Sequence, residues 1–129
     1  MARSILKSLI TIIGSFLLIA EEKAQKVEPY VRIAKIVVDS AQLESYKAAL
    51  KIGIETAVRL EPGVLSMYAV YDNKLPNHIT ILETYASLEA YQAHIQTAHF
   101  KKYKSGTLAM VKSLELTDVT PIAYERKKN

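Results

Sequence analysis

Apolar and polar residues alternate along three segments of the chain, and this pattern predicts three strands. Residues 30–38 (YVRIAKIVV) begin with alternating charged and apolar positions and are rich in Val and Ile, as strands usually are. Residues 64–71 (VLSMYAVY) and 78–85 (HITILETY) alternate in the same way, and a polar loop containing Pro76 separates them. The second and third segments therefore predict a hairpin.

A helix is predicted between the first two strands. Asp39 is a favourable N-cap residue, and Gln42 follows it at the spacing of a capping box. Apolar residues then recur at helical spacing: Leu43, Tyr46, Leu50, Ile54 and Ala57. We expect this helix to end near Leu60, because Pro62 bars its continuation and Gly63 permits a turn.

A second helical region follows the hairpin. Ser87 is expected to cap a helix whose buried stripe contains Leu88, Tyr91 and Ile95. The stripe then breaks and restarts in a further helix, at Phe100, Tyr103, Thr107, Met110 and Leu114. The basic residues of this helix are expected to point outward: Lys101, Lys102 and Lys104. A last strand is predicted from Leu114 to about Tyr124.

The predicted order of elements is βαββαβ, which is the α+β, ferredoxin-like arrangement with an antiparallel sheet. Right-handed crossovers place both helical regions on one face of such a sheet. The second strand is apolar on both sides, so alternation leaves open whether the side with Tyr68 or the side with Leu65 and Met67 is uncovered. An uncovered apolar face predicts a homodimer, in which a second copy covers it.

Residues 1–20 have the order of a secretory signal. Arg3 and Lys7 precede an apolar run that charged residues follow directly. The run is shorter than the roughly 20 residues that cross a bilayer, so we expect cleavage after Ala20 and a periplasmic or secreted protein. The alternatives are an uncleaved anchor, the one route to a membrane, or a first helix of a cytoplasmic protein. Residues 21–29 then form a spacer, residues 30–124 the domain and residues 125–129 a basic tail.

Charge and cysteine content narrow the function classes. The formal net charge is only +4, and the basic clusters lie outside any nucleic-acid-binding motif, so no nucleic-acid partner is expected. The chain has no cysteine, which excludes disulfides, thiolate metal sites and cysteine catalysis.

Two stretches of the chain resemble the antibiotic biosynthesis monooxygenase family. They are EPGVLSMYAVYD from Glu61 and ILETYASLEAYQAHIQTAHFKKY from Ile81. The specific features are Glu-Pro-Gly before the second strand, Glu-x-aromatic at the end of the third strand, and Ala-His followed by His-Phe. The resemblance spans residues 31–122 and implies a dimeric α/β barrel with one pocket per subunit. It also implies oxygenation of small aromatic or quinol substrates, often with neither flavin nor metal.

Three positions depart from patterns within that family. Tyr85 stands where the family commonly has Trp, and Ile81 stands where enzymes acting on polycyclic phenols tend to have Asn. Residues 30–38 contain no Asn, which haem-degrading relatives have in their first strand. Relatives that process a small signalling dione share the His-Phe region, so that activity stays open.

Cofactor-free oxygenation needs a base, a dry pocket and hydrogen-bond donors for an oxyanion. Glu83 shares a strand face with Ile79, Ile81 and Tyr85, and apolar surroundings would raise the pKa of its carboxyl toward working pH. We expect Glu83 to be the base. The alternative is a Glu paired with a cation or at the wet end of the sheet.

The remaining candidate residues are histidines and tyrosines. His94 and His99 are five residues apart, which separates them by about 140° on one continuous helix. With only His78 in addition, no metal site is expected. His94 and Tyr85 are catalytic candidates that orient or stabilise the substrate, and Tyr68, Tyr91 and His99 are candidates for substrate binding. Capping, surface or core-packing roles are the alternatives.

Taken together, the residues and the resemblance favour a cofactor-independent monooxygenase that uses oxygen and a quinol or another small aromatic or enediol substrate. The alternatives are a non-catalytic ligand-binding or stress-related dimer of the same fold, or an enzyme that degrades a small signalling dione.

Overall fold

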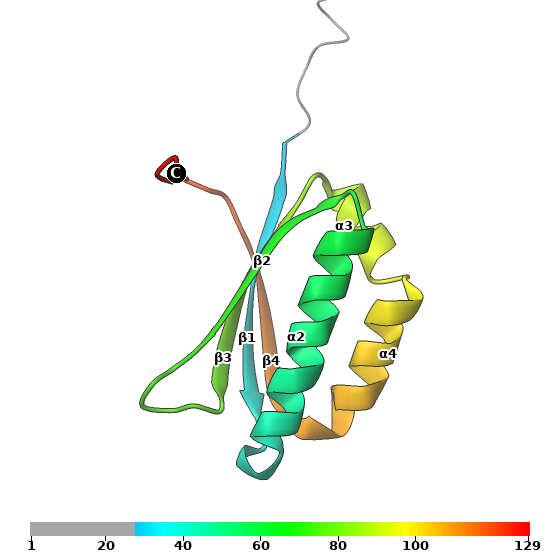
Figure 1. The fold of residues 1–129 in the computed structure, drawn as a ribbon, viewed down its shortest axis with the longest axis vertical. Helices are drawn as coiled ribbons and strands as arrows, with labels where there is room; N and C mark the ends of the chain where they lie inside the picture. The colour runs from blue at the N-terminus through cyan, green and yellow to red at the C-terminus, as the bar shows by residue number, and fades with distance from the viewer. Residues whose placement is uncertain (1–27) are drawn as a thin grey trace, which may run out of the picture.

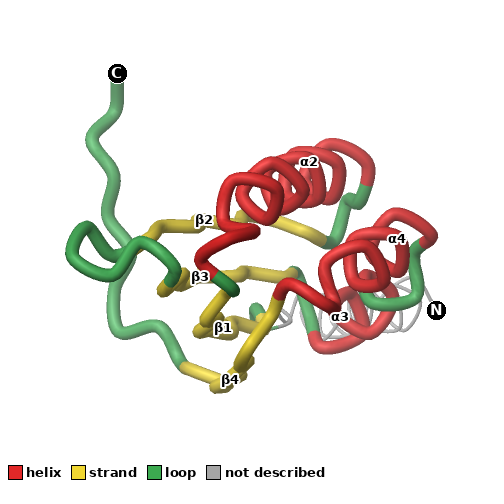
Figure 2. The backbone as a smooth tube through the Cα atoms, turned by 90° about the horizontal axis from the view of Figure 1, so that it is seen from below, coloured by secondary structure: helices red, strands yellow, loops and turns green. Residues whose placement is uncertain are grey.

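The computed structural model describes residues 28–129 and has a single four-stranded antiparallel sheet with all its helices on one face (Figures 1 and 2). The sheet has the strand order β2-β3-β1-β4. The strands are β1 (Tyr30–Val38), β2 (Val64–Tyr71), β3 (His78–Tyr85) and β4 (Val111–Val119). The α-helices are α2 (Leu43–Leu60), α3 (Leu88–His94) and α4 (Ala98–Thr107). This is the predicted ferredoxin-like α+β fold.

Short 3-10 helices complete the chain at two connections, η1 (Ser40–Gln42) before α2 and η2 (Leu108–Met110) before β4. The predicted signal segment and nearly all of the spacer lie outside the described residues. Within residues 28–129, every helix is too short or too polar to span a membrane.

Helix ends form where the predicted capping residues stand. The Asp39 carboxylate accepts a hydrogen bond from the backbone N–H of Ala41 at 3.1 Å, and the Ser87 hydroxyl accepts one from the N–H of Ala90 at 3.1 Å. Thr97 caps α4 in the same way, accepting from the N–H of Phe100 at 3.2 Å. Such caps satisfy backbone donors that a helix leaves free at its start.

The predicted last strand is wrong in its bounds. β4 begins at Val111 rather than Leu114 and ends at Val119 rather than Tyr124. Among the described strands its one neighbour is β1, and the pairing runs from Val38↔Val111 to Val31↔Val119. The ladder between β1 and β4 therefore covers nearly the whole of β1. Helix α4 ends at Thr107, earlier than its apolar pattern predicts.

The register assigns each strand residue to one face. Arg32 of β1 lies opposite Glu83 of β3, which in turn lies opposite Met67 of β2. These residues share the helix-covered face with the buried residues of the main core, namely Ala34, Ile36, Ile79 and Ile81, on which Tyr46 and Leu50 of α2 pack. An irregularity between Val64 and Ser66 inserts Leu65 into β2, which turns Val64 to the same covered face, where it is 4% exposed.

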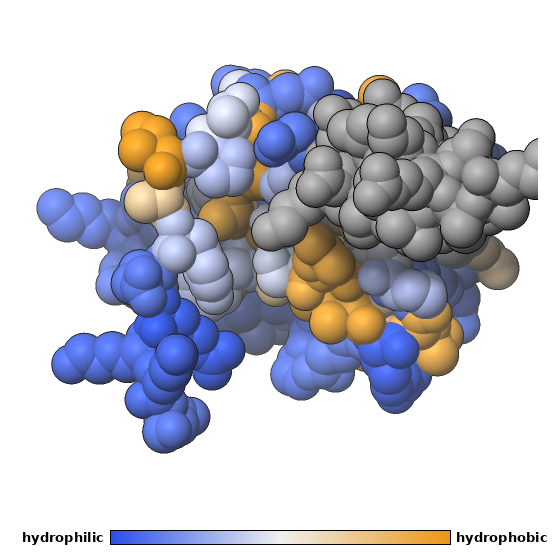
Figure 3. Space-filling model, turned by 90° about the horizontal axis from the view of Figure 1, so that it is seen from above, coloured by the Kyte–Doolittle hydropathy of each residue, from blue (hydrophilic) through white to orange (hydrophobic). Residues whose placement is uncertain are grey.

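The opposite face of the sheet carries exposed apolar side chains. Tyr68 lies opposite Leu82 in the ladder, and Val70 lies opposite Thr80. Tyr68, Val70 and Leu82 are 70%, 45% and 43% exposed. The uncovered side is thus the Tyr68 side, whereas Met67 belongs to the core. Apolar groups also reach the surface among hydrophilic ones in the view from above (Figure 3).

Candidate active site

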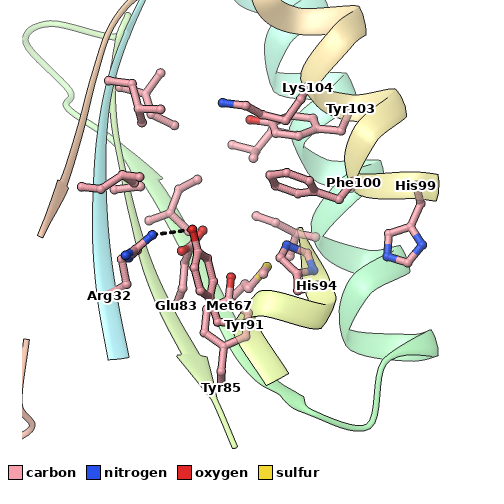
Figure 4. Close-up of a pocket in the computed structure, with 18 residues that line it drawn as sticks. Arg32, Met67, Glu83, Tyr85, Tyr91, His94, His99, Phe100, Tyr103 and Lys104 are labelled. Atoms are coloured by element: carbon pink, nitrogen blue, oxygen red, sulfur yellow. Dashed lines mark hydrogen bonds between the residues drawn. The ribbon is translucent and has the colours of Figure 1, made fainter. Parts of the chain in front are cut away.

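A cavity of about 100 Å³ lies between the sheet and the helices, and most of its wall is apolar. The sheet contributes the side chains of Ala34, Ile36 and Ile81, and α2 contributes Leu50 and Ile54. Polar side chains enter this wall from three directions: Arg32, Glu83 and Tyr85 from the sheet, Tyr91 and His94 from α3, and His99, Tyr103 and Lys104 from α4. Figure 4 shows the sheet residues facing Phe100, Tyr103 and Lys104 across the cavity. The arrangement is typical of a small-molecule site.

Glu83 is the acidic residue of this cavity. Burial raises the pKa of its carboxyl, and the Tyr85 hydroxyl and the positive charges of Arg32 and Lys104 oppose this rise. A carboxyl whose neutral form is favoured by burial can accept a proton from a bound substrate near neutral pH. Tyr85 is 1% exposed, and burial and the neighbouring Glu83 raise the pKa of its hydroxyl, so it stays a donor.

Arg32 is held in place beside Glu83 by a network of hydrogen bonds. It donates to the hydroxyl oxygens of Tyr91 and Tyr30, both at 2.6 Å, and to the Asp118 carboxylate at 3.0 Å. Its guanidinium also lies 4.3 Å from the centre of the Tyr91 ring. Because the Tyr91 oxygen accepts this bond, its own O–H can donate to a ligand in the cavity. Arg32 and Tyr91 thus offer positive charge and a donor for an oxyanion.

His94 and His99 meet on one carboxylate. Nδ1 of His94 and Nε2 of His99 each lie 2.7 Å from Oε2 of Glu61. The separation of about 140° applies only to one continuous helix, and the chain forms two, as the broken apolar pattern predicts: α3 ends at His94 and α4 begins at Ala98. The Thr97 hydroxyl donates to the His94 carbonyl oxygen at 2.7 Å and fixes this break.

Five of the six residues proposed from the sequence line the same cavity: Glu83, Tyr85, His94, Tyr91 and His99. Tyr68 does not, and that assignment is wrong. It lies on the uncovered face and borders a separate groove between α2 and β2. Met67, its neighbour, takes the cavity position because it lies opposite Glu83.

Sequence reasoning missed Arg32, Glu61 and Lys104. Lys104 was expected to point outward, but it lines the cavity although it is exposed. Arg32 carried a signal, because it is a charged residue on the strand face that also carries Ala34 and Ile36. Glu61 belongs to the Glu-Pro-Gly feature of the resemblance, but no pattern connects it with His94 and His99, because it reaches them only through the packing of three helix ends.

Comparisons with known proteins agree with this architecture. Residues 29–105 match the family described as antibiotic biosynthesis monooxygenase. A crystal structure from Bacteroides thetaiotaomicron, provisionally named an antibiotic biosynthesis monooxygenase, is 53% identical with a TM-score of 0.75, covering 79% of this chain and 97% of that one. A provisionally named monooxygenase from Lactobacillus acidophilus is 32% identical with a TM-score of 0.70, covering 74% of this chain and 46% of that one. No curated protein matches the chain.

Proposed function

Because the chain belongs to the antibiotic biosynthesis monooxygenase family, we propose that it is a monooxygenase that oxidises a small quinol, phenol or enediol without a bound cofactor. The observation that carries this proposal is Glu83, a carboxyl of raised pKa in the wall of an apolar cavity. Hydrogen-bond donors and cations stand around it, as a developing oxyanion requires.

The cavity volume limits the substrate. An engineered apolar cavity of about 150 Å³ binds benzene, and the cavity between the sheet and α4 measures about 100 Å³. A molecule with one ring, or a short enediol, is therefore the size class that fits with small side-chain adjustments. Polycyclic phenols lie outside this size class and are expected to be poor substrates, in line with Ile81 in the cavity wall.

The reaction of a hydroquinone balances without an external reductant. Glu83 takes the proton of one hydroxyl, and Arg32 and the Tyr91 hydroxyl stabilise the resulting phenolate. The electron-rich ring then reacts with O₂: one oxygen atom forms a C–O bond at the ring, and the other leaves as water. The O–O bond then breaks, and the departing oxygen takes one proton back from Glu83 and a second proton from the ring carbon that gained oxygen. The ring supplies all the electrons and becomes a hydroxyquinone.

The functional unit in this proposal is a homodimer. The uncovered sheet face exposes Tyr68, Val70 and Leu82 side by side on neighbouring strands. A contiguous apolar patch of this kind is characteristic of an interface, and an identical sheet matches it in shape and strand twist.

The proposal is tested by measuring oxygen uptake by the purified protein with a panel of hydroquinones, catechols and enediols of one ring or fewer, and with polycyclic phenols as the size control. With ¹⁸O₂, one labelled atom is expected in the product and one in water. If no compound is oxidised but some raise the melting temperature of the protein, it is a ligand-binding member of the fold and the catalytic proposal is wrong.

A further inference from the structure

The cluster of Glu61, His94 and His99 contains one carboxylate and two imidazoles whose ligand atoms all lie within 4.8 Å of one another. The His94 side chain is 6% exposed, Glu61 is 13% exposed and His99 is 25% exposed. The cluster is therefore nearly closed, with one side open to solvent at His99. The reaction proposed above uses neither Glu61 nor His99.

Each member of the cluster stands at the end of a helix, where the backbone fixes its position. Glu61 follows the last residue of α2, and its N–H donates to the Ala57 carbonyl oxygen at 2.9 Å. His94 is the last residue of α3, and His99 lies in the first turn of α4. Three helix ends thus converge, and from these ends the side chains of His94 and His99 contact that of Glu61 directly.

We propose that Glu61, His94 and His99 bind a divalent transition-metal ion of the zinc class, in which we include cobalt(II) and iron(II). Two imidazoles and one carboxylate form the ligand set of many three-ligand zinc sites, and the same set holds iron(II) in a facial arrangement. Three protein ligands leave at least one coordination position for water or another small ligand.

The adjustment that binding requires is small. Donor atoms about 2.1 Å from one ion and spaced tetrahedrally lie about 3.4 Å apart, whereas each imidazole nitrogen now lies 2.7 Å from Oε2 of Glu61. Opening both distances by roughly 0.7 Å makes room for an ion, provided that the two nitrogens, which lie within 4.8 Å of each other, also come to about that spacing. The partly exposed His99 ring can move this far toward solvent. Without an ion, hydrogen bonds link His94 and His99 to the Glu61 carboxylate. A metal-binding measurement therefore distinguishes a metal site from a purely structural hydrogen-bond network.

The experiment is titration of the untagged, chelator-treated chain with Co²⁺ and Zn²⁺, in the absence of any substrate. We expect one ion per chain by calorimetry, and for Co²⁺ a visible ligand-field spectrum of a site with nitrogen ligands. His99→Ala and Glu61→Gln are expected to weaken binding at least tenfold. His78→Ala is the matched control, because His78 is the chain's third histidine and lies exposed at the start of β3.

Circular dichroism of each metal-free variant shows whether it has folded, and His99→Ala decides the outcome if Glu61→Gln does not fold. The proposal is overturned if the wild type binds neither ion, or if His99→Ala binds as tightly as the wild type. Loss of binding in His78→Ala alone would place the ion elsewhere and also overturn it. The oxygenation proposed above routes no step through this ion, and because the titration involves no oxygen uptake, its result is independent of the proposed catalysis.

Discussion

Replacing Glu83 with Gln is expected to remove most of the oxygenase activity while making the protein more stable at neutral pH. Glutamine keeps the size of the side chain but cannot accept the substrate's proton. A general base contributes about 10²–10⁴-fold, so kcat/KM should fall at least about a hundredfold, which is about 2.7 kcal/mol of transition-state stabilisation. Wild-type kcat/KM should rise with pH through the raised pKa of Glu83, above the ordinary value of about 4.3.

Glu83→Gln is expected to lower the activity but to raise the free energy of unfolding at neutral pH. Burial raises the folded-state pKa of Glu83 above its unfolded value, so the stabilising contribution of the neutral carboxyl is complete below the unfolded pKa. It is lost as pH rises through the folded pKa. Gln cannot ionise, so above this window the variant should gain about 1.4 kcal/mol for each unit of pKa elevation, and below pH 4 the two proteins should differ little.

The assay combines initial rates of oxygen uptake with guanidinium unfolding at pH 4 and pH 8. Glu125→Gln is the matched control, because Glu125 is an exposed residue outside the helices, the strands and the cavity lining, and it should change neither quantity. The reasoning is refuted if Glu83→Gln turns over at the wild-type rate, or if it is less stable than the wild type at pH 8.

Three further outcomes are expected. Tyr85→Phe and His94→Ala should lower the rate less steeply than the loss of Glu83, because they position or stabilise an anion that can still form; steady-state oxygen uptake that is abolished by Tyr85→Phe alone would reassign the base. Light scattering should give a dimer for the wild type and a monomer or unfolded chain for Leu82→Lys, while Ile52→Lys, on an exposed position of α2, should leave the dimer intact. Mass spectrometry of protein recovered from cells should find a chain beginning near Glu21, and intact residues 1–20 would contradict export.

Local patterns are enough to predict three of the four strands and the residues that share a strand face. The bounds of β1, β2 and β3 match the predicted segments, and Glu83 and Tyr85 reach one cavity because alternation puts them on one side. Alternation does not say which side of the sheet the helices cover. The substrate-binding role proposed for Tyr68 therefore assigns it to the wrong face of the sheet. Nor does alternation reveal the inserted Leu65, which follows from pairing with β3.

The convergence of Glu61 with His94 and His99 depends on contacts between segments far apart in the chain. The broken apolar pattern predicts two helices here, and Thr97 is a good cap for the second, but the pattern does not give the angle between the two helices and so does not bring His94 and His99 together. The position of Glu61 against α3 depends on how closely the turn after α2 approaches that helix. Only the packed structure contains this information.

The close contact between the turn after α2 and helix α3 can be tested at Gly63. A Cβ added to Gly63 would lie 2.6 Å from Cβ of Ala90 in α3, and neither atom has a flexible side chain that could move aside. Gly63→Ala should therefore push α3 away from the turn and destabilise the protein by about 1–3 kcal/mol, as overpacking does. Gly106→Ala is the control: nothing lies within 4 Å of its added Cβ, and replacing a helical Gly should stabilise by roughly 0.5–1 kcal/mol.

Denaturant unfolding of the single variants and of Gly63→Ala combined with Ala90→Gly completes the test. Removing the Ala90 methyl costs about 1 kcal/mol of helix propensity by itself, but it also removes the clash, so the double variant should be more stable than the sum of the single effects by more than about 0.5 kcal/mol. Additive effects would show that the turn and α3 are not in rigid contact. In that case the packing would not hold Glu61 against His94, and their 2.7 Å contact would have to rest on the hydrogen bond alone.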